Sequence, residues 1–231
     1  MLCVCDIISA CLTWKSTVIW NDTILFIHTP KTAGMSMTSL LCEELPGPIF
    51  VTGPYDEQHR EGKVVYVPGK RHETLIDAAS FFTYRNMRLE QFEKIFVVMR
   101  NPYDLELSRY AYLRKNLPQD RGRAQDIALE SDFSEYLAKA PFFGMFPPRL
   151  DLYFHLNGAM PENMTILRYE RLSADISRYM QPYLLSFDAL PHENESKHGD
   201  AAQVYDEKME NLCFERHRWF FEKGFYARAL Y

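Results

Sequence analysis

Lys31 and Gly34 stand in a short loop between an apolar run, residues 24–27, and a segment of helical character that begins at Met35. The N-terminus of a helix presents backbone N–H groups and partial positive charge, so it attracts anions. Gly34 lets the backbone come close to an anion, Lys31 adds a point charge, and Ser36 adds a hydroxyl. The loop is therefore predicted to bind an anion; the alternative is an ordinary strand-to-helix turn with an exposed lysine.

A second pattern of this kind starts at Arg100, which follows the apolar run 96–99. Asn101 and Pro102 indicate a helix start, because Asn caps a helix and Pro suits its first position. Arg100 offers a planar fork of donors that matches phosphate. Ser108 lies about 9 Å beyond the helix start, at about 1.5 Å per residue. The alternative is that Arg100 belongs to a capped strand end and that Ser108 is an incidental serine. Together with the loop at Lys31, a second anion site predicts a nucleotide with two separated phosphate groups.

The loop at Lys31 differs from the Walker A motif of many kinases. That motif requires Gly, four residues, and then Gly-Lys-Ser/Thr. Lys31 precedes Gly34, and Gly-Lys-Ser/Thr occurs nowhere in the sequence. A P-loop-like small-molecule kinase is therefore disfavoured, although it stays an alternative function, and no Mg²⁺ site is implied.

Several further segments occur in an order that is typical of one enzyme family. In addition to residues 30–36 (Pro-Lys-Thr-Ala-Gly-Met-Ser) and the Arg100–Ser108 pair, they are residues 70–72, 167–172, 190–196 and 205–226. With them the chain resembles the PAPS-dependent sulfotransferases, where PAPS is 3′-phosphoadenosine 5′-phosphosulfate. The resemblance is closest to the branch of carbohydrate sulfotransferases and their bacterial relatives, and it extends from about residue 24 to residue 226.

The resemblance implies which residues bind the cofactor. Residues 30–36 become the 5′-phosphosulfate loop, in which the Lys31 side chain and the N–H groups of residues 32–37 hold the phosphosulfate. The loop set is Lys31, Thr32, Ala33, Gly34, Met35, Ser36 and Met37. Arg100 and Ser108 become the site of the 3′-phosphate. Leu105 departs from the family, which usually has Arg directly after this Asp, and its presence implies the loss of a structural ion pair.

Three more positions follow from the resemblance. Tyr169 matches a position near the adenine ring, and its alternative is a core aromatic after a strand. Ser196 and Lys197 match a segment that closes over the nucleotide in relatives, and the alternative for Lys197 is a solvated loop.

Sulfuryl transfer requires a stabilised leaving group, an acceptor hydroxyl that loses its proton, and the exclusion of water. Lys31 and the N–H groups of residues 32–37 would stabilise the negative charge that develops on the nucleotide leaving group. His72 matches the family position suggested as general base, and histidine titrates near working pH; a helix cap or a surface residue is the alternative. Glu73 is the other candidate base, against the interpretation of a first-turn glutamate that complements a helix dipole. His28 is interpreted as a hydrogen-bonded core histidine.

Composition limits the class of protein. The 231 residues favour one domain over residues 1–231, with an uncertain N-terminal arm at 1–22. The net charge of −5 argues against a nucleic-acid partner. Five scattered cysteines without a Cys-x-x-Cys pair indicate no structural zinc and a reducing compartment. No apolar run is long enough to span a bilayer, so a cytoplasmic, bacterial-type soluble protein is expected, with a luminal domain trimmed of its anchor as the alternative.

Apolar runs alternate with helical segments along the chain, which predicts an α/β fold with a mainly parallel sheet. The resemblance makes this a P-loop-like three-layer fold with helices on both faces. Strands are expected at residues 24–29, 64–67, 95–99 and 164–168, and helices at 35–45, 72–82, 101–116, 124–139, 171–187 and 204–223. Residues 46–63 and 188–203 are expected to be loops. Ligands of such sheets bind at the carboxyl ends of the strands, where both anion loops are placed.

The function that follows is transfer of a sulfuryl group from PAPS to a hydroxyl of a carbohydrate, a glycosylated metabolite or another small molecule. The nucleotide product is PAP, 3′-phosphoadenosine 5′-phosphate, and no metal is expected. Two alternative functions stay open: a P-loop-like small-molecule kinase and a non-catalytic nucleotide-binding protein of the same fold. The acceptor pocket is expected in the segments 46–63, 114–124 and 141–148. Neither the acceptor nor the oligomeric state follows from the sequence.

Overall fold

The computed structural model describes residues 18–70, 72–115, 117–118, 122–142, 145–146, 148–190 and 201–228. They belong to two compact units. The sheet unit comprises Met1–Met99 and Leu152–Asn194, and the helical unit comprises Arg100–Asp151 and Glu195–Tyr231. The expectation of one domain stays a prediction.

The sheet unit contains, in its described part, a seven-stranded sheet in the order β4-β5-β3-β1-β2-β6-β7. The strands are β1 Val18–Trp20, β2 Ile24–Ile27, β3 Ile49–Gly53, β4 His59–Glu61, β5 Val64–Pro68, β6 Lys94–Met99 and β7 Met164–Arg168. β1 runs antiparallel to both of its neighbours, and β4 runs antiparallel to β5. The pairs β2–β6, β3–β5 and β6–β7 are parallel. The other five strands therefore share one direction, which confirms a mainly parallel sheet.

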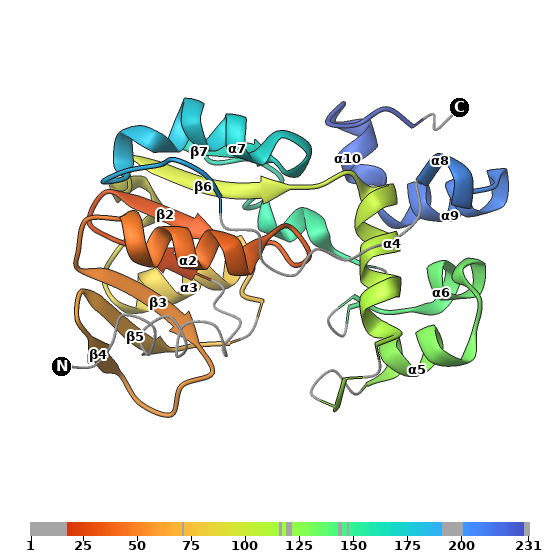
Figure 1. Ribbon diagram of the computed structural model, residues 1–231, viewed down its shortest axis with the longest axis horizontal. Helices are drawn as coiled ribbons and strands as arrows, with labels where there is room; N and C mark the ends of the chain where they lie inside the picture. The colour runs from red at the N-terminus through yellow and green to blue at the C-terminus, as the bar shows by residue number, and fades with distance from the viewer. Residues whose placement is uncertain are drawn as a thin grey trace. The chain divides into compact units, whose positions relative to one another are not determined.

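The central strands are apolar on both faces, as expected for a sheet covered by helices on each side. Every residue of β2 is buried, and so are five of the six residues of β6. Helix α2 (Gly34–Glu44) packs on one face through Met37, Leu40 and Leu41, and Figure 1 shows it in front of the sheet. On the other face Phe82 of α3 (Leu75–Tyr84) makes an edge contact with Trp20 at 5.2 Å between ring centroids. The three-layer α/β prediction is confirmed.

Shorter helical pieces complete the sheet unit. A 3-10 turn, η1 (Leu89–Gln91), precedes β6. After β7 the chain continues through η4 (Tyr169–Arg171), α7 (Leu172–Asp175), the π-helical turn η5 (Ile176–Met180) and η6 (Gln181–Tyr183). Leu172, Ile176 and Met180 join the same core as α2.

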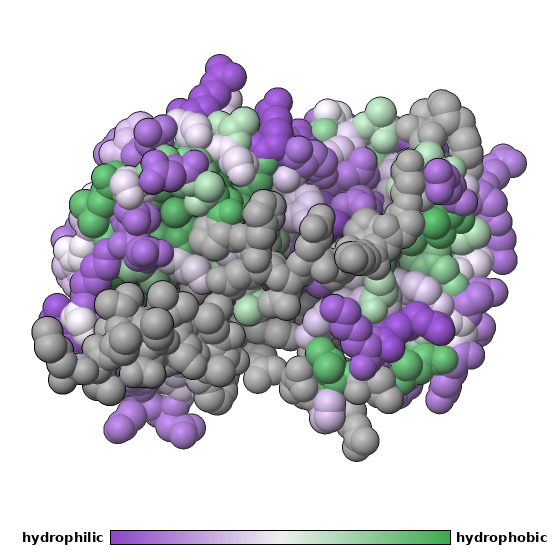
Figure 2. Space-filling model, in the orientation of Figure 1, coloured by the Kyte–Doolittle hydropathy of each residue, from purple (hydrophilic) through white to green (hydrophobic). Residues whose placement is uncertain are grey.

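The helical unit is built around α4 (Pro102–Leu113), which Figure 1 labels together with the other helices of this unit. These are α5 (Arg123–Glu130), α6 (Phe133–Lys139), α8 (Ala201–Val204), α9 (Glu207–Arg216) and α10 (Arg218–Glu222). A 3-10 turn, η3 (Leu150–Tyr153), spans the point where the chain passes from the helical unit to the sheet unit. The core contains aromatic rings and one cysteine, among them Tyr103, Tyr136, Tyr205, Cys213 and Phe221. Figure 2 shows mostly hydrophilic residues on the described surface that faces the viewer, with the hydrophobic ones in separate patches. None of the helices in the described part of the chain has the length and the apolar run that a bilayer span needs.

Several element predictions are wrong. The segment 46–63, expected as a loop, contains β3 and β4. The helix expected at 124–139 is two helices, because the Asp132 side chain accepts a hydrogen bond from Glu135 N at 2.8 Å and starts α6. The helix expected at 204–223 likewise restarts at Asp206, which caps α9, and again at His217. Within the predicted N-terminal arm, residues 18–20 form β1, while residues 1–17 lie outside the described residues.

Candidate active site

The loop between β2 and α2 is held in an unusual backbone conformation. Lys31 and Ala33 have φ values of 66° and 60°, in the left-handed region that few non-glycine residues adopt. Between them Thr32 is fully buried, and its Oγ1 donates a hydrogen bond to the Thr29 carbonyl at 2.6 Å. This bond closes the turn and accounts for a conformation that Lys31 and Ala33 would not favour by themselves.

The first turn of α2 suits an anion. Ala33 occupies the N-cap position, where its methyl group makes no hydrogen bond, and the first turn contains no acidic residue. The first bond along the helix runs from Met37 N to Ala33 O at 2.9 Å, so the N–H groups of residues 34–36 precede the regular pattern. Alanine is a poor N-cap, and a helix start without an acidic residue suits a bound anion.

Gly34 is required at its position for a reason that the sequence did not reveal. A Cβ atom at this position would lie 1.7 Å from Nε2 of His28, so a side chain cannot be accommodated without moving the imidazole. Gly34 itself does not have a positive φ; the residues that do are its neighbours in the loop. His28 is buried, as the core interpretation expected, and its ring lies directly against Gly34.

His72 lies beside the same histidine. The ring centroids of His28 and His72 are 6.3 Å apart, and His72 has a φ of 60°. Its carbonyl accepts a hydrogen bond from the Tyr153 hydroxyl at 3.0 Å. His72 does not cap α3, because the N-cap is Thr74, so that alternative is wrong. The structure therefore places the predicted base close to the predicted anion loop within the sheet unit.

Glu73 has a different role from a first-turn glutamate. It precedes the N-cap of α3, whose first-turn acid is Asp77, so the dipole interpretation is wrong. Its side chain is only 5% exposed. The carboxylate accepts hydrogen bonds from the Thr52 hydroxyl and from Lys70 N, the latter at 3.2 Å. Sequence analysis did not single out Thr52 or Tyr153, because no local pattern marks a strand threonine or an aromatic residue as the partner of a turn 21 or 81 residues away.

Arg100 and Ser108 belong to the helical unit. The Arg100 side chain is 6% exposed, and its guanidinium pairs with Asp104, with Nε at 2.6 Å from Oδ2. Ser108 is 1% exposed. The predicted helix start is confirmed, since Asn101 Oδ1 accepts from Tyr103 N at 3.0 Å and Pro102 is the first helical residue. Leu105 is buried, at a place where an unpaired charge would be costly.

A buried ion network in α4 was missed by the sequence analysis. Glu106 is fully buried and accepts from Arg216 Nε at 3.1 Å, Tyr136 at 2.9 Å and His217 Nε2 at 2.7 Å. Arg109, also buried, donates to the Tyr136 hydroxyl at 2.9 Å. Burial alone would raise the pKa of Glu106, but the Arg216 charge and the hydrogen bond with His217 outweigh it and hold that pKa far below its ordinary value. Glu106, Arg109 and Arg216 look like surface charges in sequence, so their residue types gave no signal of burial.

Tyr169 follows β7 directly and packs, half-buried, against the core of the sheet unit. Ser196 and Lys197 lie outside the described residues, and their predicted contact with the nucleotide stays a prediction.

The sheet topology brings segments that are far apart in sequence to the same edge of the sheet. β2, β5 and β7 run in the same direction, so the segments after them, with Lys31, His72 and Tyr169, all start at the carboxyl edge of the sheet. β6 lies between β2 and β7 and ends at Met99, the residue before Arg100. Ligands of parallel sheets bind at this edge.

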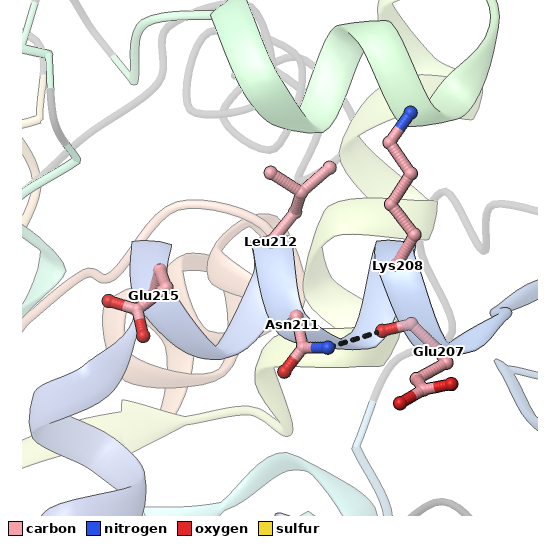
Figure 3. A pocket seen from close by; sticks show the side chains of 5 residues that line it. All are labelled: Glu207, Lys208, Asn211, Leu212 and Glu215. Carbon is pink, nitrogen blue, oxygen red and sulfur yellow. Dashed lines mark hydrogen bonds between the residues drawn. The ribbon is translucent and has the colours of Figure 1, made fainter.

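Hollows also occur away from these residues. One of about 440 Å³ lies along α9, where Figure 3 shows its five lining side chains and the bond from Asn211 Nδ2 to the Glu207 carbonyl at 2.9 Å. Another, of about 490 Å³, lies in the sheet unit and is lined by Pro54, Tyr55, Asp56, Glu57, His59, Glu61 and Tyr66. The second falls largely in the segment 46–63 that was expected to shape the acceptor pocket.

Comparisons with known proteins agree with this architecture. The crystal structure of mouse sulfotransferase SULT7A1 complexed with PAP matches with a TM-score of 0.50 over 94% of this chain and 88% of that chain, at 14% sequence identity; at that identity the likeness concerns the fold. No curated protein matches the chain. The family model described as "Sulfotransferase domain" matches residues 83–220, a range that contains Arg100, Ser108 and Tyr169 and begins after the Lys31 loop. Because this range is more than half of the chain, the chain belongs to the sulfotransferase domain family, an enzyme family that transfers sulfuryl groups.

Proposed function

We propose that this enzyme transfers a sulfuryl group from PAPS to a hydroxyl of a carbohydrate or a glycosylated small molecule. The observation that carries the proposal is the cluster of Gly34, His28 and His72, which puts an imidazole beside a helix N-terminus without a side-chain cap. An anion loop next to a candidate base is the arrangement that sulfuryl transfer to a hydroxyl requires. The PAP named in the mouse structure adds support for the cofactor.

Lys31 and the N–H groups of residues 32–37 are proposed to stabilise the leaving group. Negative charge develops on the bridging oxygen as the S–O bond breaks, and donors that are already oriented stabilise it without reorganisation. The backbone of Lys31 is held by the turn that Thr32 closes. Loss of one such donor typically raises the barrier by about 3 kcal/mol.

Arg100 is proposed to bind the 3′-phosphate, with Ser108 as a second contact. The ion pair with Asp104 fixes the plane of the guanidinium, and a guanidinium of fixed orientation is suited to bidentate recognition of phosphate. Tyr169, at the end of β7, is proposed to contact the adenine ring, as Ser196 and Lys197 are proposed to contact the nucleotide.

His72 is proposed as the base that accepts the proton of the acceptor hydroxyl. The acceptor pocket is proposed to include the segment 46–63, part of which lines the hollow of about 490 Å³ described above.

The test is thermal stabilisation by PAP, compared with 5′-AMP and with ATP plus Mg²⁺. A ligand at a hundred times its dissociation constant adds about 2.7 kcal/mol of stability. We expect a clear rise in Tm with PAP only, lost in Arg100→Ala and kept in Arg60→Ala, which removes an exposed arginine from β4. A rise with ATP plus Mg²⁺ instead would favour the kinase, and PAP binding without turnover of any acceptor would favour a non-catalytic binding protein.

A further inference from the structure

His72 has a positive φ, a backbone conformation that few non-glycine residues adopt. A non-glycine residue in the left-handed region is uncommon and persists only where its surroundings enforce it. His72 has a φ of 60° and lies in the turn between β5 and α3. The contacts that enforce this conformation therefore also determine where the imidazole points.

The Glu73 carboxylate supplies the first of these contacts. One oxygen accepts from the Thr52 hydroxyl in β3, and the other accepts from Lys70 N at 3.2 Å. Thr52 is itself fixed, because it is fully buried and its Oγ1 accepts from Val18 N at 3.1 Å. The carboxylate thus ties the start of the turn to the middle of the sheet.

Gly69 permits this arrangement. A Cβ there would lie 2.8 Å from the Thr52 Cβ and 2.9 Å from the Glu73 Oε1, and the Gly69 N–H donates to the Gly53 carbonyl at 2.7 Å. The glycine lets the carboxylate approach the turn closely enough to accept the Lys70 N–H.

Tyr153 supplies the second contact, at the other end of the turn. Its side chain is fully buried, and its hydroxyl donates to the His72 carbonyl at 3.0 Å. Burial, with the negative charges of Asp77 and Glu73, raises the pKa of Tyr153, so the phenol remains a neutral donor at working pH. One bond holds the chain before His72 and the other holds His72 itself.

We propose that Glu73 and Tyr153 are positioning residues that hold the His72 imidazole next to the phosphosulfate loop. The inference rests on the proposed function, in which His72 is the base. It also assigns Glu73, which the sequence left as an alternative base, to a supporting role: its two oxygens are engaged by Thr52 and Lys70 inside the fold rather than presented to a substrate.

The decisive variants are Glu73→Gln, Glu73→Ala and Tyr153→Phe. An amide can accept from Lys70 N and donate to Thr52, so Gln keeps the turn, whereas Ala removes both bonds. Tyr205→Phe is the matched control, because Tyr205 is also a buried tyrosine whose hydroxyl donates to a backbone carbonyl at 3.0 Å, that of Tyr103.

The first readout is the side-chain spectrum of ¹⁵N-histidine-labelled protein saturated with PAP. The chain has seven histidines, and His72→Gln assigns the resonance of interest. We expect this resonance to shift or broaden in Glu73→Ala and Tyr153→Phe, and to stay in place in Glu73→Gln and Tyr205→Phe. An unmoved resonance in Glu73→Ala and Tyr153→Phe would overturn the proposal.

The second readout is turnover of ³⁵S-labelled PAPS with a mixture of neutral glycosides as acceptors. Misplacement of a catalytic group by about 1 Å costs about 100-fold in rate, so kcat should fall by about this factor in Glu73→Ala with an unchanged KM for PAPS. Glu73→Gln should keep most of the wild-type kcat. A kcat in Glu73→Gln as low as that in Glu73→Ala would overturn the proposal and make Glu73 the base. If PAP fails to stabilise the wild type, the proposed function fails and this inference fails with it. If PAP does stabilise the wild type, an unmoved His72 resonance or a low kcat in Glu73→Gln removes the positioning role alone.

Discussion

At the scale of single residues, the candidate site depends on positions where the side chain is small or the backbone strained. Lys31, Ala33 and His72 all adopt positive φ, and Gly34 leaves room for the His28 ring. Strain of this kind is retained where the surrounding structure over-determines it, and it is common at functional sites. A change in this backbone conformation is therefore expected to disturb the candidate site.

Lys31→Ala should abolish most sulfuryl transfer and leave the fold intact. The lysine is proposed to stabilise charge that exists only as the S–O bond breaks, so kcat should fall by at least about 100-fold while Tm changes little. Initial rates with ³⁵S-labelled PAPS and a thermal melt provide the two measurements. Wild-type turnover in this variant would exclude Lys31 from the reaction.

Gly34→Ala should destabilise the protein. Its Cβ would overlap the His28 ring, and overpacking of this kind typically costs about 1–3 kcal/mol. Urea unfolding measures the loss. In a His28→Ala background the same Gly34→Ala substitution should cost less than it does in the wild type; if the two substitutions are additive, the contact is not the cause.

At the scale of elements, the sequence predicted the parts whose signals are local. The strand after Ile24, the start of α4 at Asn101 and the strand β7 all follow from apolar runs and capping residues. β3 was missed because Pro48 and Gly53 enclose a short apolar stretch in a region rich in charge, although Ile49, Phe50 and Val51 carried a β-branched and aromatic signal. The contacts of Glu73 with Thr52 and of His72 with Tyr153 were beyond reach, since only the assembled sheet unit brings those residues together.

Thr74→Ala should weaken the start of α3. The Thr74 hydroxyl accepts from Asp77 N at 3.2 Å, and the Asp77 carboxylate accepts from Thr74 N at 3.0 Å, which forms a capping box. Loss of such a cap costs about 1 kcal/mol. The free energy of unfolding in urea should fall by this amount, and Thr83→Ala at the exposed end of the same helix should have a smaller effect.

At the scale of the whole molecule, acid should destabilise the protein through the network around Glu106. Burial lowers the pKa of His217 below its ordinary value of 6.5, an effect only partly offset by its bond to Glu106, so the unfolded chain binds a proton there more readily than the folded one. The His217 Nδ1, buried and without a hydrogen-bond partner among the described residues, agrees with a neutral ring.

Both shifts act in the same direction. His217 contributes stability that is present above about pH 6.5 and is lost as the pH falls through its lowered pKa. Glu106 contributes stability that is present above about pH 4.5 and is lost at lower pH. The free energy of unfolding, measured in urea from pH 8 to pH 4, should therefore decrease below about pH 6.5.

His217→Gln provides the control for this pH dependence. It keeps a donor for Glu106 and removes the titrating ring, so the decrease between about pH 6.5 and pH 5 should become shallower. An unchanged slope would assign the decrease to other groups.

Labelling of the Cys213 thiol can report the opening of the helical unit. The thiol is fully buried in α9, and burial raises its pKa well above the ordinary value, so a thiol-labelling reagent should reach it as a reactive thiolate only when the surrounding helices separate. Labelling in increasing urea, compared with the loss of helical circular dichroism and with Cys213→Ser as blank, would report that event. If residues 1–231 behave as one domain, the two transitions should coincide; labelling at lower urea would mean that the helices around Cys213 can open while the sheet remains folded.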